Sequence, residues 1–387
     1  MSMTTHKPEN SRSALQPILV VSTNQFGYHI HTRKYSEYLA NFYAVTYLCW
    51  DYSLPKVKSD TTTVKYVSRQ GNKALRYVRF LNAINQELGS NKYDLVFVKY
   101  FHGVSLLKMF HSDKLFNVDI RTNSIKQHSY TRYFGDKLLR YECSRFANVT
   151  IISSRLAKSL HLKKWHILPL GGDQLSTDEK SFDKIHLLYV GTLHKRNILE
   201  CVKGLHLYLK QDAANERVDL LFTIIGDAAG NELNEIREFV AKNNLESFVK
   251  PLGYVYYNEL NKYFERANVG VSYIPMTKYF DNQPPTKTYE YLLSGLAVIA
   301  TKTGENETIL HESCGVLIKD NIESFANGLK RIIARRSEFN SNDIKKRYQD
   351  NLWENILEKN LRVYIQNLIA AHRGRIDHHN SKASRRL

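Results

Sequence analysis

The feature that most constrains the fold is a series of short, nearly continuous apolar runs that alternate with helical patterns. Strands covered on both faces of a parallel sheet have this continuous apolar character. Helical patterns such as His31–Asn41 and Lys73–Leu88 lie between the runs. The first half of the chain contains six of them: Pro17–Thr23, Ala44–Trp50, Tyr93–Lys99, Phe116–Arg121, Asn148–Ser153 and Trp165–Leu170. This alternation predicts a doubly wound parallel sheet.

A second series of runs follows a polar, glycine-led stretch, Gly171–Lys184. A chain of 387 residues is also too long for one ordinary core. We therefore predict an α/β protein with two Rossmann-like domains in tandem. The runs of the second series are Ile185–Gly191, Leu220–Gly226, Phe248–Gly253, Asn268–Ile274, Leu296–Thr301 and Gly315–Ile318.

The same patterns predict the domain boundaries. We expect a long amphipathic helix to pack back toward the N-terminal domain, and both ends of the chain, which are polar, to be disordered. The predicted parts are a disordered N-terminus (1–15), an N-terminal domain (16–172), a linker (173–184), a C-terminal domain (185–340), the long helix (341–371) and a basic tail (372–387).

Charge and cysteine content narrow the class of protein. The net charge is +17, and residues 1–180 hold 26 Lys and Arg against 13 Asp and Glu. This asymmetry indicates an anionic membrane surface, an acidic lipid-linked substrate or nucleic acid as a partner. The four cysteines form no CxxC pair, which is typical of a reducing cytosol. Because no apolar run reaches about 18 residues and the N-terminus lacks a hydrophobic segment, we expect neither a membrane span nor a secretory signal.

The stretch DNQPPTKTYEYLLSGLAVIAT (281–301) predicts a ligand site. Two prolines precede a short helix that begins near Thr286 and ends at Gly295. The first-turn N–H groups of Thr286, Lys287 and Thr288 have no helical partner, so a phosphate would satisfy them, with Lys287 adding charge. Glu290, one turn on, would accept hydrogen bonds from a ribose diol. The alternative is an ordinary helix whose early carboxylate favours the helix dipole.

Several segments together resemble retaining glycosyltransferases of family 4, which have the GT-B fold of two facing Rossmann-like domains with a cleft between them. PPTKTYEYLLSGLAVIAT (284–301) resembles the donor-site helix of that family. The resemblance covers about residues 15 to 335 and is stronger in the second half. The other matching segments are YVGTLHKRN (189–197), FTIIGDAAG (222–230), VKPLGYVYYNELNKYFERANVGVSYIP (249–275) and HILPLGGD (166–173).

The resemblance implies a role for residues of the second domain, which would bind the nucleotide sugar. Glu290 matches the second glutamate of the family's E-x7-E motif, which holds the ribose, while Asn282 replaces the first. Arg196, with Lys195 or Lys203, resembles the basic pair that neutralises the diphosphate leaving group. The resemblance also places Gly191, Pro285, Thr286, Lys287 and Thr288 at the donor site.

In the first domain, which would face the acceptor, Gly27 resembles the glycine that lets the backbone approach the donor phosphate. The alternative for Gly27 is an ordinary turn. The family often has a histidine after the fifth strand, where this chain has Arg121, so His102 is the nearest candidate histidine. Both are also open to structural roles, since Arg121 and Asp119 are placed to pair with each other.

The resemblance implies a retaining reaction in which the leaving phosphate takes the proton of the acceptor. We expect no metal and no other cofactor, because the sequence contains no Asp-x-Asp motif and basic groups are available to stabilise the diphosphate. The expected partners are a nucleotide-sugar donor and a lipid-linked or glycan acceptor. The competing readings are a GT-B epimerase or phosphorylase and a non-enzymatic polyanion-binding protein.

Two basic stretches, residues 72–88 and 128–147, predict helices with arginines and lysines beside apolar or tyrosine side chains. Such helices either pack on a sheet as ordinary surface helices or dock on an anionic membrane. We expect a cytoplasmic protein that binds peripherally to the cytoplasmic face of the membrane. No nucleic-acid-binding motif is present, so nucleic acid is not an expected partner.

Overall fold

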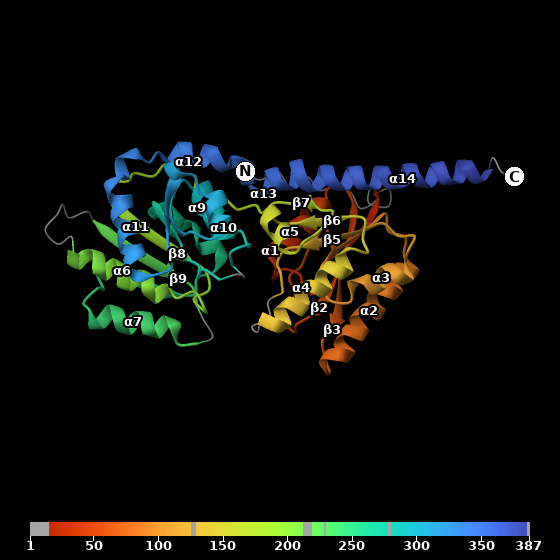
Figure 1. The fold of residues 1–387 in the computed structure, drawn as a ribbon, viewed down its shortest axis with the longest axis horizontal. Helices are drawn as coiled ribbons and strands as arrows, with labels where there is room; N and C mark the ends of the chain where they lie inside the picture. The colour runs from red at the N-terminus through yellow and green to blue at the C-terminus, as the bar shows by residue number, and fades with distance from the viewer. Residues whose placement is uncertain (1–14, 125–128, 212–218, 228–229, 278–279, 385–387) are drawn as a thin grey trace. The chain divides into compact units, whose positions relative to one another are not determined.

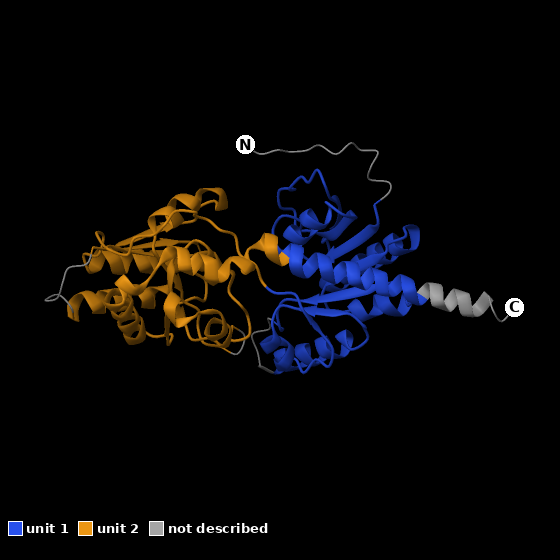
Figure 2. Ribbon diagram, turned by 90° about the horizontal axis from the view of Figure 1, so that it is seen from above, with its two compact units in different colours: residues 1–169, 357–387 blue, residues 170–356 orange. Residues whose placement is uncertain are grey.

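The computed structural model describes residues 15–124, 129–211, 219–227, 230–277 and 280–384. The chain divides into two compact units (Figure 2). Unit 1 contains Met1–Pro169 and Leu357–Leu387, and unit 2 contains Leu170–Ile356. Each unit has one parallel sheet with helices packed on it (Figure 1). The predicted α/β architecture of two Rossmann-like domains is confirmed.

The sheet of unit 1 has seven strands in the order β3-β2-β1-β4-β5-β6-β7. Six of them match predicted runs, and β3 is the strand that the sequence reading missed. Only one of its six residues is buried, because β3 lies at the edge of the sheet, so its sequence lacks a continuous apolar run. The strands are β1 Pro17–Ser22, β2 Ala44–Asp51, β3 Thr63–Ser68, β4 Leu95–Lys99, β5 Phe116–Ile120, β6 Val149–Ile151 and β7 His166–Ile167.

The strand order of unit 1 reverses between β1 and β4. Since crossovers between parallel strands are right-handed, α1 lies on one face of the sheet and α2 to α5 lie on the other. On that second face, α3 contacts both α2 and α4. The helices are α1 Ile30–Leu39, α2 Lys73–Ser90, α3 Val104–Phe110, α4 Ser129–Cys143, α5 Ser154–Ser159 and, at the end of the chain, α14 Val363–Ser384.

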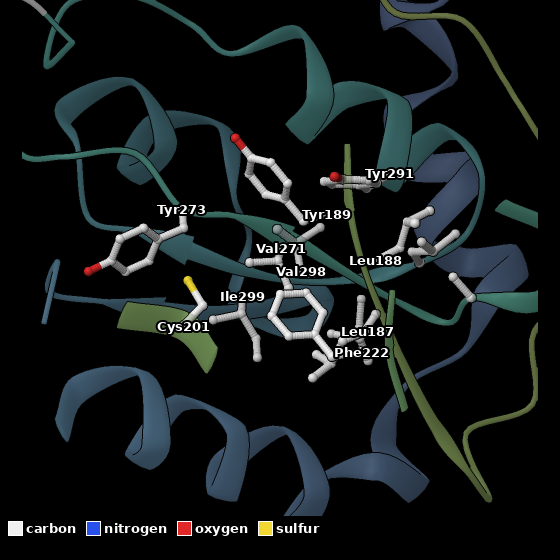
Figure 3. Packing of buried hydrophobic residues seen from close by; sticks show 14 of the residues in the cluster. Leu187, Leu188, Tyr189, Cys201, Phe222, Val271, Tyr273, Tyr291, Val298 and Ile299 are labelled. Atoms are coloured by element: carbon white, nitrogen blue, oxygen red, sulfur yellow. The ribbon is translucent and has the colours of Figure 1, made fainter. Parts of the chain in front are cut away.

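Unit 2 has a six-stranded sheet in the order β10-β9-β8-β11-β12-β13. Figure 3 shows part of its core, in which Leu187, Phe222 and Ile299 come together from three strands. The strands are β8 Ile185–Val190, β9 Leu220–Ile225, β10 Val249–Gly253, β11 Val269–Ser272, β12 Ala297–Thr301 and β13 Gly315–Ile318. The helices are α6 Ile198–Gln211, α7 Glu232–Lys242, α8 Asn261–Arg266, α9 Thr286–Leu293, α10 Gly304–Ile309, α11 Ile322–Ala334, α12 Ser341–Tyr348 and α13 Trp353–Ile356.

The C-terminal segment differs from the single helix predicted over residues 341–371. It is broken into α12, α13 and α14, with a 3-10 turn at Gln349–Asn351 and a π-helical turn at Leu357–Arg362. The first break arises where the chain pairs with Gly172: Leu352 forms a β-bridge to it, and the Trp353 N–H donates to its carbonyl at 3.1 Å. Beyond the second break, α14 packs on unit 1, where Tyr364 donates to Asn117 at 2.7 Å.

The predicted boundaries shift accordingly. The predicted linker (173–184) lies within unit 2, and the boundary expected after residue 340 falls after Ile356. The interval predicted as a disordered tail begins inside α14, which extends to Ser384. Residues 1–14 and 385–387, also expected to be disordered, lie outside the described residues. Among the helices of the described part, none is both long enough and apolar enough to cross a membrane.

Candidate functional site

Helix α9 is fixed against the sheet of unit 2 by its own sequence. Pro285 precedes its first residue, and the helix ends at Leu293, shortly before Gly295, whose N–H donates to the Leu292 carbonyl at 3.0 Å. Between these ends Tyr291 is fully buried, and its hydroxyl accepts the N–H of Val190 at 2.9 Å. This bond joins α9 to the end of β8, so the start of α9 faces the carboxyl edge of the sheet, where ligands bind in such folds.

The three backbone N–H groups predicted to face a phosphate are not equivalent. Thr288 N–H donates to the Pro285 carbonyl at 3.1 Å. Its hydroxyl is buried and bonds with Ser272 at 2.7 Å and Asn306 at 3.0 Å, which gives Thr288 a structural position. The N–H groups of Thr286 and Lys287 have no hydrogen-bond partner among the described residues. These two donors are therefore available to a ligand.

Lys287 extends from α9 to the turn that follows β8. Its ammonium lies 3.9 Å from the centroid of the Tyr189 ring. Gly191 makes room for it: a Cβ at this glycine, whose φ is +146°, would lie 2.9 Å from the Lys287 Nζ. Burial and then the charge of Arg196 lower the pKa of Lys287 from 10.5 to about 7, although Glu290 opposes the shift. Two basic side chains, Lys287 and Arg196, thus lie close enough at this site to affect each other's charge.

The loop after β8 separates the three basic candidates of this region. The guanidinium of Arg196 lies 4.1 Å from the centroid of the Phe280 ring and close enough to Lys287 to affect its pKa. Lys195 is exposed and has a left-handed backbone, with φ of 56°. Lys203 lies 5.8 Å from the ring of Phe239 on α7. Lys287 is therefore a further basic neighbour of Arg196, in addition to Lys195 and Lys203, which the sequence suggested.

Glu290 lies one helical turn after Lys287 and is partly buried. Gly172 passes close to the backbone here, since a Cβ on it would be 3.2 Å from the Glu290 nitrogen. The next residue, Asp173, accepts a hydrogen bond from the Tyr257 hydroxyl at 2.6 Å. Burial, the charge of Glu290 and the bond to Asp173 raise the pKa of Tyr257. Tyr257 and Asp173 thus join Glu290 at this end of the site, although the sequence reading quoted their segments without giving either residue a role.

Asn282 lies in the loop between β11 and α9 and is partly exposed. Asp281 anchors this loop, because its carboxylate accepts the N–H of Gly304 at 2.7 Å at the start of α10. The N–H of Gln283 donates to the Phe280 carbonyl at 3.2 Å, which closes a turn around Asn282. Asn282 is therefore held on an anchored turn just before the start of α9.

The candidates of unit 1 have structural partners. Arg121 is buried, pairs with Asp119 at 2.6 Å, and donates to the Leu168 carbonyl at 2.9 Å. The structure thus shows the Asp119–Arg121 pair that the sequence allowed. Gly27 has φ of 93°, and a Cβ there would lie 2.4 Å from Val57, so a turn and close packing both require glycine.

His102 belongs to a network around Glu142, a buried carboxylate at the end of α4. Its Nδ1 lies 2.9 Å from the Tyr100 hydroxyl, which in turn lies 2.8 Å from Glu142. The same carboxylate accepts the N–H of Gly103 at 2.8 Å and the hydroxyl of Ser105 at 3.1 Å. The network ties the β4–α3 turn to α4, and this accounts for the placement of His102.

The described residues contain no group of three or more His, Cys, Asp and Glu side chains placed to hold a metal ion. The arrangement in unit 2 instead offers two N–H groups, a lysine and an arginine at one end and an acid beside a tyrosine at the other. The first set suits a diphosphate, and the second suits a diol.

Comparison with known proteins is consistent with this geometry. Residues 184–335, most of unit 2, match the family model described as glycosyl transferases group 1. No curated protein matches the sequence.

Solved structures resemble the whole chain at low sequence identity. Sucrose-phosphate synthase from Thermosynechococcus elongatus is 19% identical, with a TM-score of 0.67 over 92% of this chain and 100% of that one. HepE of Anabaena, in complex with UDP, is 13% identical, with a TM-score of 0.66 over 91% and 100%. The lipopolysaccharide outer core galactosyltransferase WaaB is 12% identical, with a TM-score of 0.64 over 92% and 99%. The chain thus has the GT-B fold, and its residues 184–335 match the model of group 1 glycosyltransferases.

Proposed function

We propose that the protein is a retaining, metal-independent glycosyltransferase that moves a sugar from a nucleotide-diphosphate sugar to a lipid-linked or polysaccharide acceptor at the cytoplasmic face of a membrane. The observation that carries the proposal is the convergence of the Thr286 and Lys287 N–H groups, the Lys287 ammonium and the Arg196 guanidinium at the start of α9, with Glu290 one turn away.

The chemistry of the leaving group explains why these residues suit the reaction. When the glycosidic bond to the diphosphate breaks, negative charge develops on the leaving phosphate. Lys287 and Arg196 lie where they can receive it, and a bound anion would favour the charged form of Lys287, whose pKa is lowered by burial and by Arg196. Glu290 would accept the ribose hydroxyls, as an acidic residue near a phosphate-binding helix start does in other dinucleotide sites.

Similar structures suggest the first donor to test. HepE of Anabaena is described in complexes with UDP and with UDP-glucose. WaaB is described as a galactosyltransferase of the lipopolysaccharide outer core. These descriptions support a uridine diphosphate sugar as donor and a glycan or glycolipid as acceptor.

The proposal predicts slow donor hydrolysis with retention in the presence of EDTA. The protein is incubated with UDP-α-glucose and other UDP-, GDP- and ADP-α-sugars, and the products are followed by proton NMR before mutarotation. We expect UDP and the α-anomer of the free sugar, at a rate that Mn²⁺ changes less than twofold. A β-anomer first product contradicts retention, and an epimerised UDP-sugar indicates the epimerase alternative. A rate that requires Mn²⁺ contradicts neutralisation by Lys287 and Arg196.

Unit 1 carries a surface that suits the membrane part of the proposal. Helices α3 and α4, which contact each other, expose Phe110 (67%), Met109 (66%), Tyr130 (80%) and Phe134 (63%). The basic residues Arg132, Lys137 and Arg140 lie on α4 among these side chains. Apolar and aromatic groups beside cations are typical of surfaces that enter the headgroup region of an anionic bilayer.

Helix α2, which covers most of the basic stretch 72–88, is a weaker candidate for docking on a membrane. Arg76 donates to the Gly71 carbonyl at 2.6 Å, and Arg79 donates to the carbonyls of Ser68 and Gln70 at 3.0 and 2.9 Å. Both guanidinium groups therefore already serve the turn before α2, which leaves fewer donors for lipid phosphates. We therefore propose α3 and α4, rather than residues 72–88, as the main membrane-docking surface.

We expect the double variant Tyr133→Ser/Phe134→Ser to reduce co-sedimentation with vesicles containing anionic lipid at low salt by at least fivefold. Both side chains are 63% exposed, so the fold should be retained. The matched control is Tyr254→Ser/Tyr256→Ser in unit 2, which removes two aromatic residues of similar exposure. High salt should release the wild type, because it screens the basic residues. Equal sedimentation of the two double variants would contradict docking through α4.

A further inference from the structure

A cluster of polar side chains in unit 1 lies where the strand order of its sheet reverses. The order β2-β1-β4-β5 places β1 and β4 side by side, with Val21 opposite Val98. Chain connections leave these two strands in opposite directions, and ligands bind in the crevice that this opens at the carboxyl ends. Lys99 is the last residue of β4, and Asn24 and His29 follow β1.

At this edge of the sheet, the hydrogen-bond partners of the Lys99 ammonium are neutral side chains. Its ammonium donates to the Asn24 side-chain oxygen at 2.7 Å and lies 2.7 Å from Nε2 of His29. The other ring nitrogen of His29, Nδ1, is buried and makes no hydrogen bond within the described part of the chain. A buried polar atom of this kind is costly unless a water or a ligand completes it.

The charges of the cluster do not balance. The carboxylate of Asp119 lies near both Lys99 and Arg121. It forms an ion pair with the Arg121 guanidinium at 2.6 Å and raises the pKa of Lys99. Burial, with a smaller contribution from the charge of Arg121, lowers the pKa of Lys99 to about 8, although Asp119 opposes the shift. Burial and then the charges of Lys99 and Arg121 lower the pKa of His29 to about 3. Among the described residues of the cluster, two cations, Lys99 and Arg121, thus face one anion, Asp119.

We propose that Lys99, His29 and Asn24 form a binding site for an anionic group of the acceptor, a phosphate or a carboxylate. The anion would accept hydrogen bonds from the Lys99 ammonium and the His29 ring and restore the balance of charge. The assignment to the acceptor rests on the proposed function, in which the donor diphosphate is held by unit 2. It gives the acceptor a chemical class: a sugar phosphate, a lipid phosphate or an acidic glycan.

The test uses the full chain with saturating UDP, which fills the donor site. Inorganic phosphate is the probe, and its binding is measured by ³¹P NMR line broadening and by thermal shift. Lys99→Met keeps the length of the side chain without its charge, and His29→Ala retains Lys99. We expect phosphate affinity to fall at least tenfold in Lys99→Met and severalfold in His29→Ala. Lys92→Met, at an exposed lysine of the same unit, should bind phosphate like the wild type.

A pH series with sulfate, which does not itself titrate in this range, gives an independent readout. The charged and titratable groups around Lys99 are His29, His31, Asp119 and Arg121. Since Lys99 loses its proton above about pH 8, sulfate binding should weaken as the pH rises through that value in wild type. The dependence should be absent in Lys99→Met.

The outcomes separate the two sources of phosphate. Unchanged UDP affinity together with lost phosphate binding in Lys99→Met supports an acceptor site. If the variant instead loses UDP affinity tenfold and the wild type binds no phosphate beside UDP, the crevice serves the donor and the acceptor assignment fails. Equal phosphate affinity in wild type and Lys99→Met overturns the site itself. Failure of the proposed function would appear differently, as no UDP binding by the wild type.

Discussion

Replacing Lys287 with methionine is expected to weaken UDP binding by about 2–4 kcal/mol, roughly 30- to 700-fold, without destabilising the fold. The lysine lies at the turn of Gly191 and near Arg196, so its loss is expected to remove a charge-assisted bond to the diphosphate. Methionine fills a similar volume and contacts the Tyr189 ring without the cost of burying a charge. A structural lysine would show the opposite result, with stability lost and affinity retained.

The pKa of Lys287 gives the variant a second signature. In the native state it is about 7, below the value of 10.5 that an exposed lysine has. Between these values the unfolded state binds more protons, so the free energy of unfolding contributed by this group rises with pH from about 7 to 10.5. This contribution should vanish in Lys287→Met, which is measured by urea unfolding at pH 7 and pH 9.

Binding of the diphosphate should also draw a proton onto Lys287, because an adjacent anion favours the charged form. At pH 8 the terminal phosphate of UDP is already ionised. Calorimetry in two buffers with different ionisation enthalpies should therefore show uptake of up to one proton by the wild type and none by Lys287→Met. The control is Lys203→Met, which removes a lysine from the same unit whose ammonium faces α7. Uptake that persists in Lys287→Met would assign the proton to another group.

The strands and the position of α9 were predictable because their causes are local. Buried strands such as β8 and β12 are continuous in apolar residues, and Pro285 and Gly295 mark the ends of α9 within the same short stretch. The edge strand β3 was missed because solvent covers it and its sequence carries no such run.

Features that depend on contacts between segments distant in the sequence could not be predicted. For example, the sequence did not indicate that Lys287, on α9, lies near Arg196 and the Tyr189 ring. Similarly, the break before α13 arises where Trp353 packs on Gly171 and pairs with Gly172, residues that lie far earlier in the chain. The amphipathic pattern of the C-terminal segment gives no sign of this pairing.

Replacing Glu290 with alanine is expected to cost about 2–3 kcal/mol of UDP affinity, since a carboxylate that accepts hydrogen bonds from a diol makes charge-assisted bonds. The fold should survive, because the apolar residues that bury α9, Tyr291, Leu292 and Leu293, are unchanged. A simple loss of affinity, however, does not identify the ribose as the partner. Glu290 also raises the pKa of Lys287, so its removal weakens the phosphate end of the site.

A double-mutant cycle between the protein and the ligand separates these two effects. Wild type and Glu290→Ala are each titrated with UDP and with 2′,3′-dideoxyuridine diphosphate, which lacks both hydroxyls. The loss seen with the dideoxy ligand reports the electrostatic effect on Lys287, and the additional loss seen with UDP reports the diol. We expect a coupling energy of about 1.5–3 kcal/mol, the value of hydrogen bonds to a charged group. Glu290→Gln, which keeps an acceptor oxygen without the charge, should recover part of that coupling while showing the full electrostatic loss. If the variants lose the same affinity for both ligands, Glu290 acts on the phosphates through Lys287, and the ribose is held elsewhere.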